Sequence, residues 1–442
     1  MIHDELDIAN PKQTDEFIGY YQRIRNDTEK LAQPLAIEDY MIQAMTEASP
    51  TKWHLGHTSW FFEAFILKKF TELKTTQGLL TQPYTPENEQ YNYLFNSYYQ
   101  DVGIPWPRNQ RGNVSRPTVA EVYDFRKYID QFMLELIDSS LHTEQIQTLT
   151  VLGGNHEQQH QELIMTDIKY NLSINPLFPV YKKTPALQQK EEEVPQLEFV
   201  DFDSGVIEIG HNQPGCFAFD NERPLKKVYL DNFRLANRLV TNGEYLKFME
   251  AGGYQDHRYW LSEGWDRVRT EQWTAPLYWH KMDGEWYTFT LSGLKPLNLS
   301  EPATHISFFE ADAYAKWAGK RLPLEGEWEH AVRTLGITPE QGNFRESGLL
   351  HTRPVSHEEI EHQKVAQLYG DVWEWTNSSY LPYPGFNVLA EGISEYNGKF
   401  MSSQFVLRGG SAVTPIDHIR PSYRNFWHPH TRFQFSGIRL AE

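Results

Sequence analysis

The sequence predicts two domains of different fold class, which together make an α plus α+β protein: a bundle of four long helices, then an irregular α+β domain. Three observations lead to this prediction. Helical periodicity dominates residues 1–183, a segment rich in proline and glutamate follows at 184–199, and ten of the 13 tryptophans lie after residue 250. A chain of 442 residues is also longer than one ordinary hydrophobic core supports.

The helices of the first domain are predicted from apolar residues spaced three and four apart and from capping signals. The segments with these features are 14–31, 37–45, the run WHLGHTSWFFEAFILKKF behind Ser49-Pro50, 118–137 and about 143–171. A loop at about 101–117 precedes Thr118 and Glu121, which are placed as a capping box. Four long helices favour an up-and-down bundle, and the core of such a bundle commonly holds metal ligands.

The second domain, residues 200–442, is expected to be α+β with long loops. The linker TPALQQKEEEVPQLEF (184–199) has two prolines, a run of glutamates and no periodicity. Beyond it come short strand-like runs such as GVIEIG and FVLRGG, separated by Gly and Pro turns, and one clear helix, ISFFEADAYAKWAGK. Short strands with a single clear helix among them do not predict a doubly wound parallel sheet, in which strands and helices alternate.

Composition narrows the classes of partner. The net charge of -18, from 59 acidic and 41 basic residues, argues against nucleic acid or an anionic membrane. Cys216 is the single cysteine, which excludes an intrachain disulfide and favours a reducing compartment. Neither a signal peptide nor an apolar run of about 18 residues is seen. We therefore expect a cytoplasmic protein that acts on small molecules, with its oligomeric state left open.

The stretch GGNHEQQHQELI contains H-E-x-x-H, the helical pattern of zinc metalloproteases. His156 and His160 are four residues apart, so both imidazoles face the same way and can share one metal ion. Neither protease completion follows: positions 163–166 are Leu, Ile, Met and Thr, and no ligating glutamate occupies a following helix. A third ligand is available upstream in His57, whereas His54 is interpreted as a packed core residue. Three neutral imidazoles leave positions open for substrate and dioxygen. Such a site suits oxygen chemistry on Fe(II) better than it suits hydrolysis.

The motifs that surround these histidines are similar to those of a known family. KWHLGHTSWFFE, FNSYYQ, PRNQRGNVSRPTVAEVY and NHEQQHQE resemble the DinB-like metal-binding domain of ergothioneine-type sulfoxide synthases, the EgtB family. GKRLPLEGEWEHAVR, GDVWEWTNSSYLPYPGF, VLRGGSA and SYRNFWHPHTRFQFSGIRLA resemble the formylglycine-generating-enzyme-like, C-type-lectin-like domain that follows it in that family. The resemblance covers nearly the whole chain, and the order of the two domains is highly specific.

The resemblance implies a non-haem Fe(II) enzyme that uses dioxygen to join a thiol sulfur to C2 of the imidazole of hercynine, yielding a sulfoxide. The thiol is cysteine or γ-glutamylcysteine, and the product leads to ergothioneine. His57, His156 and His160 are the implied iron ligands. Gln159, which precedes the last ligand, is expected beside the substrate imidazole.

The remaining substrate contacts are also implied by the resemblance. Arg108 and Arg111 match the pair that holds the carboxylate of the sulfur donor, for which the planar guanidinium is well suited. Asn425 matches a position that contacts the trimethylammonium group, with Phe426 and Trp427 beside it as aromatic faces. Some members have an aspartate where this chain has Trp427, which leaves two alternatives open: a cation–π contact takes the place of that charge, or the amine is held differently, with another specificity for the methylation state.

A tyrosine is the expected proton donor, because C–S bond formation needs an acid that acts before plain thiol oxidation. Tyr98 and Tyr99 of the first domain are favoured over Tyr380 and Tyr383 of the second. The sequence does not distinguish within either pair.

Several alternatives follow from the same residues. A formylglycine-generating enzyme needs a pair of cysteines, which Cys216 alone does not provide. A 5-histidylcysteine sulfoxide synthase usually carries an extra methyltransferase domain, for which no room is expected. A selenium-using relative of similar length stays open. From another class, the first domain can be a metal-dependent thiol S-transferase and the second a lectin-like binding module.

Overall fold

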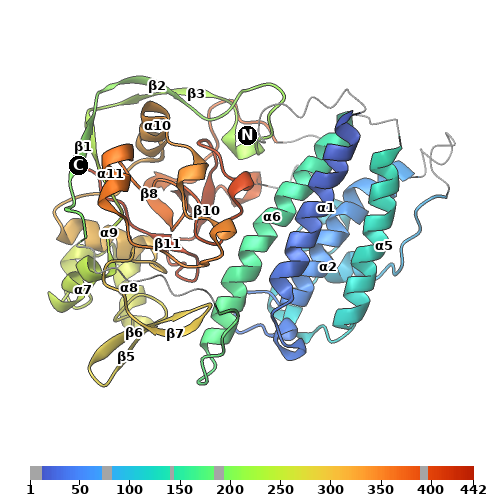
Figure 1. The fold of residues 1–442 in the computed structure, drawn as a ribbon, viewed down its shortest axis with the longest axis horizontal. Coiled ribbons are helices and arrows are strands. Elements are labelled where there is room, and N and C mark those ends of the chain that lie inside the picture. The colour runs from blue at the N-terminus through green and yellow to red at the C-terminus, as the bar shows by residue number, and fades with distance from the viewer. Residues whose placement is uncertain (1–11, 72–81, 140–143, 184–193, 389–396) are drawn as a thin grey trace. The chain divides into compact units, whose positions relative to one another are not determined.

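The computed structural model describes residues 12–71, 82–139, 144–183, 194–388 and 397–442 (Figure 1). The chain divides into two compact units. The N-terminal unit is mainly Met1–Leu177, and the C-terminal unit is mainly Phe178–Asn212, Ala218–Leu389 and Tyr396–Glu442. Most of the predicted linker, residues 184–193, lies outside the described residues.

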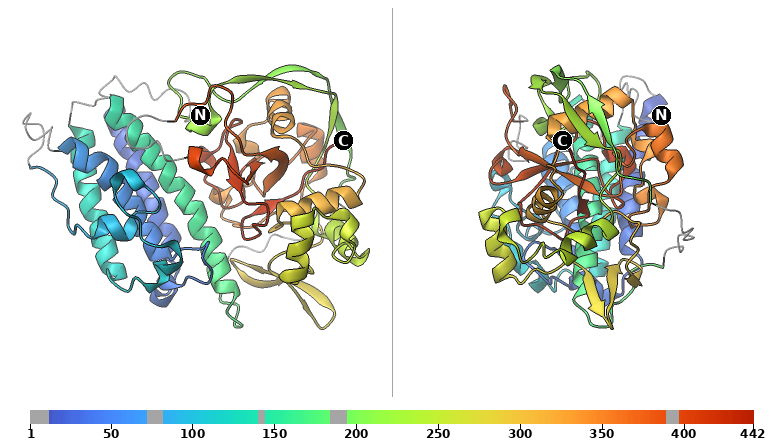
Figure 2. Two further views of the ribbon diagram at one scale, coloured as in Figure 1. Left: turned by 180° about the vertical axis from the view of Figure 1, so that it is seen from behind. Right: turned by 90° about the vertical axis from the view of Figure 1, so that its left-hand side faces the viewer.

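Four long helices form the N-terminal unit: α1 (Lys12–Ala32), α2 (Thr51–Phe62), α5 (Val119–Asp138) and α6 (Glu144–Ser173). They lie side by side in Figure 1 and in the left view of Figure 2, with α1 against α5 and α6, and α2 against the same two helices. Shorter elements connect them: α4 (Tyr91–Phe95), a π-helical turn (Glu63–Leu67), and 3₁₀ turns at Ile37–Met41, Gln100–Val102 and Arg108–Asn113.

Helix α2 is buried along its whole length, from Thr51 to Phe62. Most of its residues are apolar or small, and buried polar side chains such as Lys52 and His57 bond to backbone carbonyls. The helix therefore has no water-facing stripe and lies in the interior of the unit. The helix begins directly after Pro50, and α5 begins with the predicted capping box between Thr118 and Glu121. Both predicted starts are confirmed.

The helix predicted at 37–45 is wrong beyond its first turn. Only Ile37–Met41 is helical, and it is a 3₁₀ turn. The side chain of Asn171 donates to the carbonyl of Ile42 and accepts from the amide of Ala44, at 2.9 Å each. These bonds satisfy backbone groups that a continuing helix would otherwise pair within itself.

The C-terminal unit combines short strands and short helices, as the sequence predicts. A central sheet has the strand order β10-β9-β8-β11, in which only β8 and β11 are parallel. The other sheets are the antiparallel pairs β1–β4 and β2–β3 and the meander β5–β6–β7. The strands are β1 (Phe199–Phe202), β2 (Gly205–Ile209), β3 (Lys226–Leu230), β4 (Phe233–Ala236), β5 (Trp279–Met282), β6 (Glu285–Thr290), β7 (Gly293–Pro296), β8 (Trp373–Ser379), β9 (Phe405–Arg408), β10 (Asn425–Trp427) and β11 (Ser436–Gly437).

The helices of this unit pack around the sheets, and its core is rich in tryptophan. They are α7 (Asn242–Glu250), α8 (Ser262–Thr270), α9 (Phe308–Trp317), α10 (Glu325–Leu335) and α11 (His357–Gln363). Trp328, Trp373 and Trp375 are among the largest fully buried side chains. No helix among the described residues has the length and apolar character that a membrane crossing requires.

Candidate functional site

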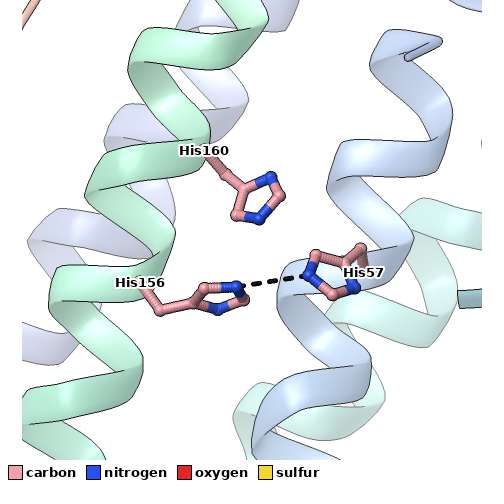
Figure 3. Close-up of side chains that lie close together, drawn as sticks. All are labelled: His57, His156 and His160. Carbon is pink, nitrogen blue, oxygen red and sulfur yellow. Dashed lines mark hydrogen bonds between the residues drawn. The ribbon is translucent and has the colours of Figure 1, made fainter. Parts of the chain in front are cut away.

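Three histidines from two helices of the N-terminal unit form a buried group. His57 projects from α2, and His156 and His160 project toward it from successive turns of α6 (Figure 3). One ring nitrogen of each histidine lies within 4.8 Å of the others, and the Nε2 atoms of His57 and His156 are 3.2 Å apart. Among the described residues this is the one group of His, Cys, Asp and Glu side chains with such spacing.

Two adjacent glycines allow α6 to approach its neighbours closely at this level. A Cβ atom on Gly153 would lie 2.5 Å from the ring of Phe62 on α2, and one on Gly154 would lie 2.5 Å from the hydroxyl of Tyr20 on α1. Real Cβ atoms do not tolerate such contacts, so any larger residue pushes α6 outward. The glycines of GGNHEQQH therefore help to bring His156 within reach of His57.

Burial keeps these imidazoles neutral. It lowers the pKa of His156 to about 3, and together with the neighbouring histidines it holds the pKa of His57 and His160 well below the usual value. The neutral ring is the form that binds a metal ion. The group is therefore ready to bind a cation near neutral pH.

Hydrogen bonds orient two of the three rings. Nδ1 of His57 donates to the carbonyl of Phe95 at 2.6 Å, which leaves Nε2 directed at the group. Nδ1 of His160 lies 2.8 Å from Nδ1 of His54. His54 is buried, in line with the prediction of a packed residue, but its polar contacts were missed because hydrogen-bond partners far apart in sequence give no periodic signal.

Glu157, the central residue of H-E-x-x-H, belongs to the scaffold. Its two carboxylate oxygens accept from Arg25 of α1 and Arg126 of α5, at 2.9 Å each. Burial alone raises the pKa of a carboxyl group, but the two guanidinium groups hold the pKa of Glu157 below its usual range. With both oxygens engaged, Glu157 is not placed to act as the general base of a zinc protease.

The two predicted arginines occupy different environments. Arg111 is 4% exposed, and its guanidinium lies over Trp53, with Cζ 3.4 Å from the ring centroid. Trp53 in turn stacks on His57, with ring centroids 4.6 Å apart, so one tryptophan separates Arg111 from the histidine group. Arg108 is exposed and donates to the carbonyl of Glu47.

Arg111 differs from the other buried arginines of the described chain. Seven are buried, and six of them form an ion pair with a carboxylate: Arg25, Arg126, Arg238, Arg408, Arg424 and Arg439. Within the described residues Arg111 has no ion pair; its side chain donates to Ser49 Oγ at 2.9 Å. A buried cation without a carboxylate is costly, and a bound anion removes that cost.

Tyr98 and Tyr99 lie close to the histidine group. The hydroxyl of Tyr98, a half-buried residue, is 3.3 Å from that of the fully buried Tyr99. Tyr99 packs against Trp60 with ring centroids 5.8 Å apart, and Trp60 stacks on His57 at 5.4 Å. The pair is therefore one aromatic layer from the nearest histidine.

The alternative tyrosines are both buried inside the C-terminal unit. The hydroxyl of Tyr380 accepts from Asn221 Nδ2 at 2.9 Å, and that of Tyr383 lies 3.3 Å from Glu325 Oε2. Burial raises the pKa of both phenols well above the usual value, and Glu325 raises that of Tyr383 further. Each hydroxyl group therefore has a polar partner within the C-terminal unit.

The predicted trimethylammonium residues form β10 in the C-terminal unit. Asn425 accepts from the amide of Phe426, whose ring stacks on Tyr380 at 4.1 Å. Trp427 packs edge-on against Phe433 at 5.4 Å. In the N-terminal unit Gln159, which precedes the ligand candidate His160, is half-buried.

Comparisons with known proteins give the chain its context. Hercynine oxygenase of Mycobacterium tuberculosis is 36% identical over 240 residues, which cover 51% of this chain and 56% of the relative. Ergothioneine biosynthesis protein 1 of Schizosaccharomyces pombe is 29% identical over 235 residues, covering 51% of this chain and 28% of the relative. The matched residues thus span about half of the first of these two relatives and less of the second. PvdO of Pseudomonas aeruginosa, a solved structure with 19% identity, covers 57% of this chain and 98% of its own at a TM-score of 0.40, too low to support an argument.

The C-terminal part of the chain gives the family directly. Residues 184–442 match the family described as sulfatase-modifying factor enzyme 1-like domain. This match confirms the predicted formylglycine-generating-enzyme-like class of the second domain, which follows a helical N-terminal region. It includes more than half of the 442 residues. The chain belongs to the family of proteins that contain a sulfatase-modifying factor enzyme 1-like domain.

Proposed function

We propose that this protein is a non-haem Fe(II) enzyme that joins the sulfur of cysteine or γ-glutamylcysteine to C2 of the hercynine imidazole. The reaction uses dioxygen, yields a sulfoxide and belongs to ergothioneine biosynthesis. The observation that carries the proposal is the buried group of three neutral histidines, with Arg111 one tryptophan away and without an ion pair among the described residues. The similarity to hercynine oxygenases supports the same reaction.

The proposal includes the remaining assignments made from the sequence. We assign the N-terminal unit to the DinB-like four-helix bundles, with domains at 1–183 and 200–442 joined by a linker at 184–199. The enzyme acts in the cytoplasm on small molecules and without nucleic acid or membrane partners. The net charge of -18 supports the absence of nucleic acid and anionic membrane partners. The lone cysteine supports a reducing compartment.

The donor set fits an iron ion. Nδ1 of His57 is bonded to a backbone carbonyl and Nδ1 of His160 to His54, so both rings offer Nε2 to a shared ion. His156 adds a third neutral imidazole from the same helix as His160. Three neutral ligands leave coordination positions for thiol and dioxygen, and bound Fe(II) supplies the electrons that activate dioxygen.

Arg111 binds the carboxylate of the sulfur donor in this proposal. Its guanidinium lies over the ring of Trp53 and has no carboxylate partner among the described residues. A substrate carboxylate can therefore form a charge-assisted, bidentate pair with it. Arg108, which is exposed, contributes a weaker and more screened attraction.

Tyr98 and Tyr99 supply the proton, and Gln159 contacts the hercynine imidazole. The contact between the two tyrosine hydroxyls forms a short path along which a proton can be passed. Gln159 lies next to His160, so its amide can bond the imidazole ring of the substrate. We assign recognition of the trimethylammonium group to Asn425, Phe426 and Trp427, since aromatic rings attract quaternary amines.

The direct test is reconstitution. The full chain is purified without oxygen, loaded with Fe(II), mixed with hercynine and either thiol, and exposed to air. We expect a sulfoxide adduct by mass spectrometry and stoichiometric loss of dioxygen. Absence of oxygen consumption with every thiol, while iron is bound, contradicts the proposal. Thiol transfer under strictly anaerobic conditions supports a metal-dependent S-transferase instead.

A second test addresses the ligands. His57→Ala removes one of three imidazoles, and we expect the variant to lose Fe(II) binding in a chelator competition assay. His305→Ala, which replaces a buried histidine of the C-terminal unit, is the matched control and should bind Fe(II) like the unmodified protein. Equal iron affinity of the His57 variant and the control contradicts the assignment of the third ligand.

A further inference from the structure

A chain of three buried side chains extends from His160 away from the histidine group. Nδ1 of His160 contacts Nδ1 of His54 at 2.8 Å, and Nε2 of His54 contacts Oδ2 of Asp167 at 2.9 Å. The same Oδ2 atom accepts from the backbone amide of Ser49 at 2.8 Å. His54, His160 and Asp167 are at most 8% exposed, so water does not compete for these bonds.

The positions of the donors decide where the protons lie. The Asp167 oxygen already accepts from the Ser49 amide, and it accepts from His54 as well, so Nε2 of His54 carries a proton. A neutral His54 then presents Nδ1 as an acceptor. His160 must donate to it from Nδ1, and its Nε2 lone pair is left for the shared ion.

The two helices that carry the ligand candidates also carry this second set of residues. His54 precedes His57 on α2 by three residues, about one turn, and Asp167 follows His160 on α6 by seven, about two turns. His57 is oriented differently, because its Nδ1 donates to the neutral carbonyl of Phe95. His160, by contrast, is connected to the carboxylate of Asp167 through the imidazole of His54.

We propose that His54 and Asp167 are positioning residues that hold His160 in the tautomer with Nε2 free and make its imidazole a stronger metal ligand. This inference rests on the metal centre of the proposed function and adds two residues to it. Carboxylate–histidine partners behind a ligand typically contribute 10- to 100-fold in metal affinity. We expect a loss of about that size when the connection is cut.

Three substitutions divide the chain of bonds into its parts. His54→Leu removes the acceptor for His160. His54→Asn keeps a carbonyl oxygen near the position of Nδ1 but loses contact with Asp167, and Asp167→Asn keeps the imidazole and removes the charge. Thr166→Val is the matched control, because Thr166 is buried next to Asp167 on α6 and its hydroxyl donates to the carbonyl of Leu163, outside this chain of bonds.

The measurement uses the full-length, metal-free protein with Co(II), and with Fe(II) under anaerobic conditions, in competition with a chromophoric chelator. We expect dissociation constants about 10- to 100-fold higher for His54→Leu, intermediate values for the two Asn variants, and a change of at most about twofold for Thr166→Val. In Zn(II)-loaded protein labelled with ¹⁵N-histidine, the nitrogen shifts of His160 should show a proton on Nδ1 and the metal on Nε2.

The outcomes separate this inference from the proposed function. Failure of the unmodified protein to bind Co(II), Zn(II) or Fe(II) overturns both. Tight binding by the unmodified protein together with unchanged affinity in a folded His54→Leu variant overturns only the role of His54, as does metal on Nδ1 of His160. If His54→Leu does not fold, His54→Asn and Asp167→Asn decide the question: unchanged affinity in both overturns the proposal, and a loss in both supports it.

Discussion

Two buried arginines of the helical unit, Arg126 and Arg111, differ in the contacts that replace water around their guanidinium groups. Arg126 donates to Glu157 at 2.9 Å and to the hydroxyl of Thr58 at 2.9 Å. Arg111 lies on Trp53 and donates to a serine hydroxyl. Both guanidinium groups are nearly inaccessible to water, yet only Arg126 has a carboxylate among the described residues.

The surroundings of the two regions shift the pKa of a buried arginine in opposite directions. Burial lowers the pKa of Arg25, the second partner of Glu157, but the carboxylates of Asp130 and Glu157 raise it above the usual value. For Arg111, burial and the nearby Arg108 both lower the pKa, and the weaker attraction of Asp167 does not compensate. Removing one partner of a buried ion pair is costly because the other charge is left uncompensated. A buried guanidinium with no ion pair among the described residues can still gain an anionic partner by binding one.

The largest expected effect comes from breaking the paired region. Glu157→Gln leaves Arg25 and Arg126 buried without a countercharge, and we expect the free energy of unfolding to fall by about 3–5 kcal/mol. Urea unfolding of the metal-free protein measures this. Arg111→Met is the comparison variant, and its unfolding free energy should stay within about 1 kcal/mol of the unmodified protein or increase. Equal losses in the two variants would contradict the distinction.

Next in size is the effect of removing the proton donor beside the histidine group. Tyr98→Phe or Tyr99→Phe should slow sulfoxide formation about 100-fold, because a positioned acid typically contributes at least that factor. Product analysis should show thiol oxidation without C–S bond formation. Tyr380→Phe, the matched change in the C-terminal unit, should lower stability by about 1 kcal/mol and leave the product ratio unchanged. A changed ratio in Tyr380→Phe would move the acid to that unit.

A smaller effect is expected from replacing Arg111. Arg111→Met should raise the KM for cysteine about tenfold, through loss of a charge-assisted bond of roughly 1.5 kcal/mol or more. Oxygen consumption at saturating hercynine measures it. Cysteamine, which lacks the carboxylate, should show the same KM in the variant and the unmodified protein. An equal penalty for both thiols would show that Arg111 does not bind the carboxylate.

Acid gives the smallest and most gradual change. Burial alone raises the pKa of Glu325, but Arg424 and Arg408 hold it below the usual value of 4.5. Its stabilisation is therefore present above about pH 4.5 and is lost as the pH falls through its lowered folded-state pKa. Glu325→Gln should flatten the decline of unfolding free energy below pH 4.5, and Arg111→Met should leave it unchanged. A flatter decline in Arg111→Met would mean that Arg111 has a carboxylate partner.

Local signals account for the parts of the fold that the sequence predicts well. The capping box at Thr118 and the start of α2 after Pro50 depend on neighbours within one turn, so they are visible in sequence. The helix predicted at 37–45 is wrong beyond its first turn because Asn171, more than a hundred residues away, bonds to the carbonyl of Ile42 and the amide of Ala44. A tertiary hydrogen bond of this kind overrides a weak helical pattern.

The sequence by itself determined that His156 and His160 face one way, since four residues make about one helical turn. It also determined the change from helical periodicity in the first half to short strand-like runs rich in tryptophan in the second half. Only the tertiary structure decided which distant residues share a buried space: His57 beside the other two histidines, Glu157 between two arginines, and His54 with Asp167 behind His160. Helix packing sets these contacts, and it depends on close approaches such as that of Gly153 to Phe62, which no local pattern records.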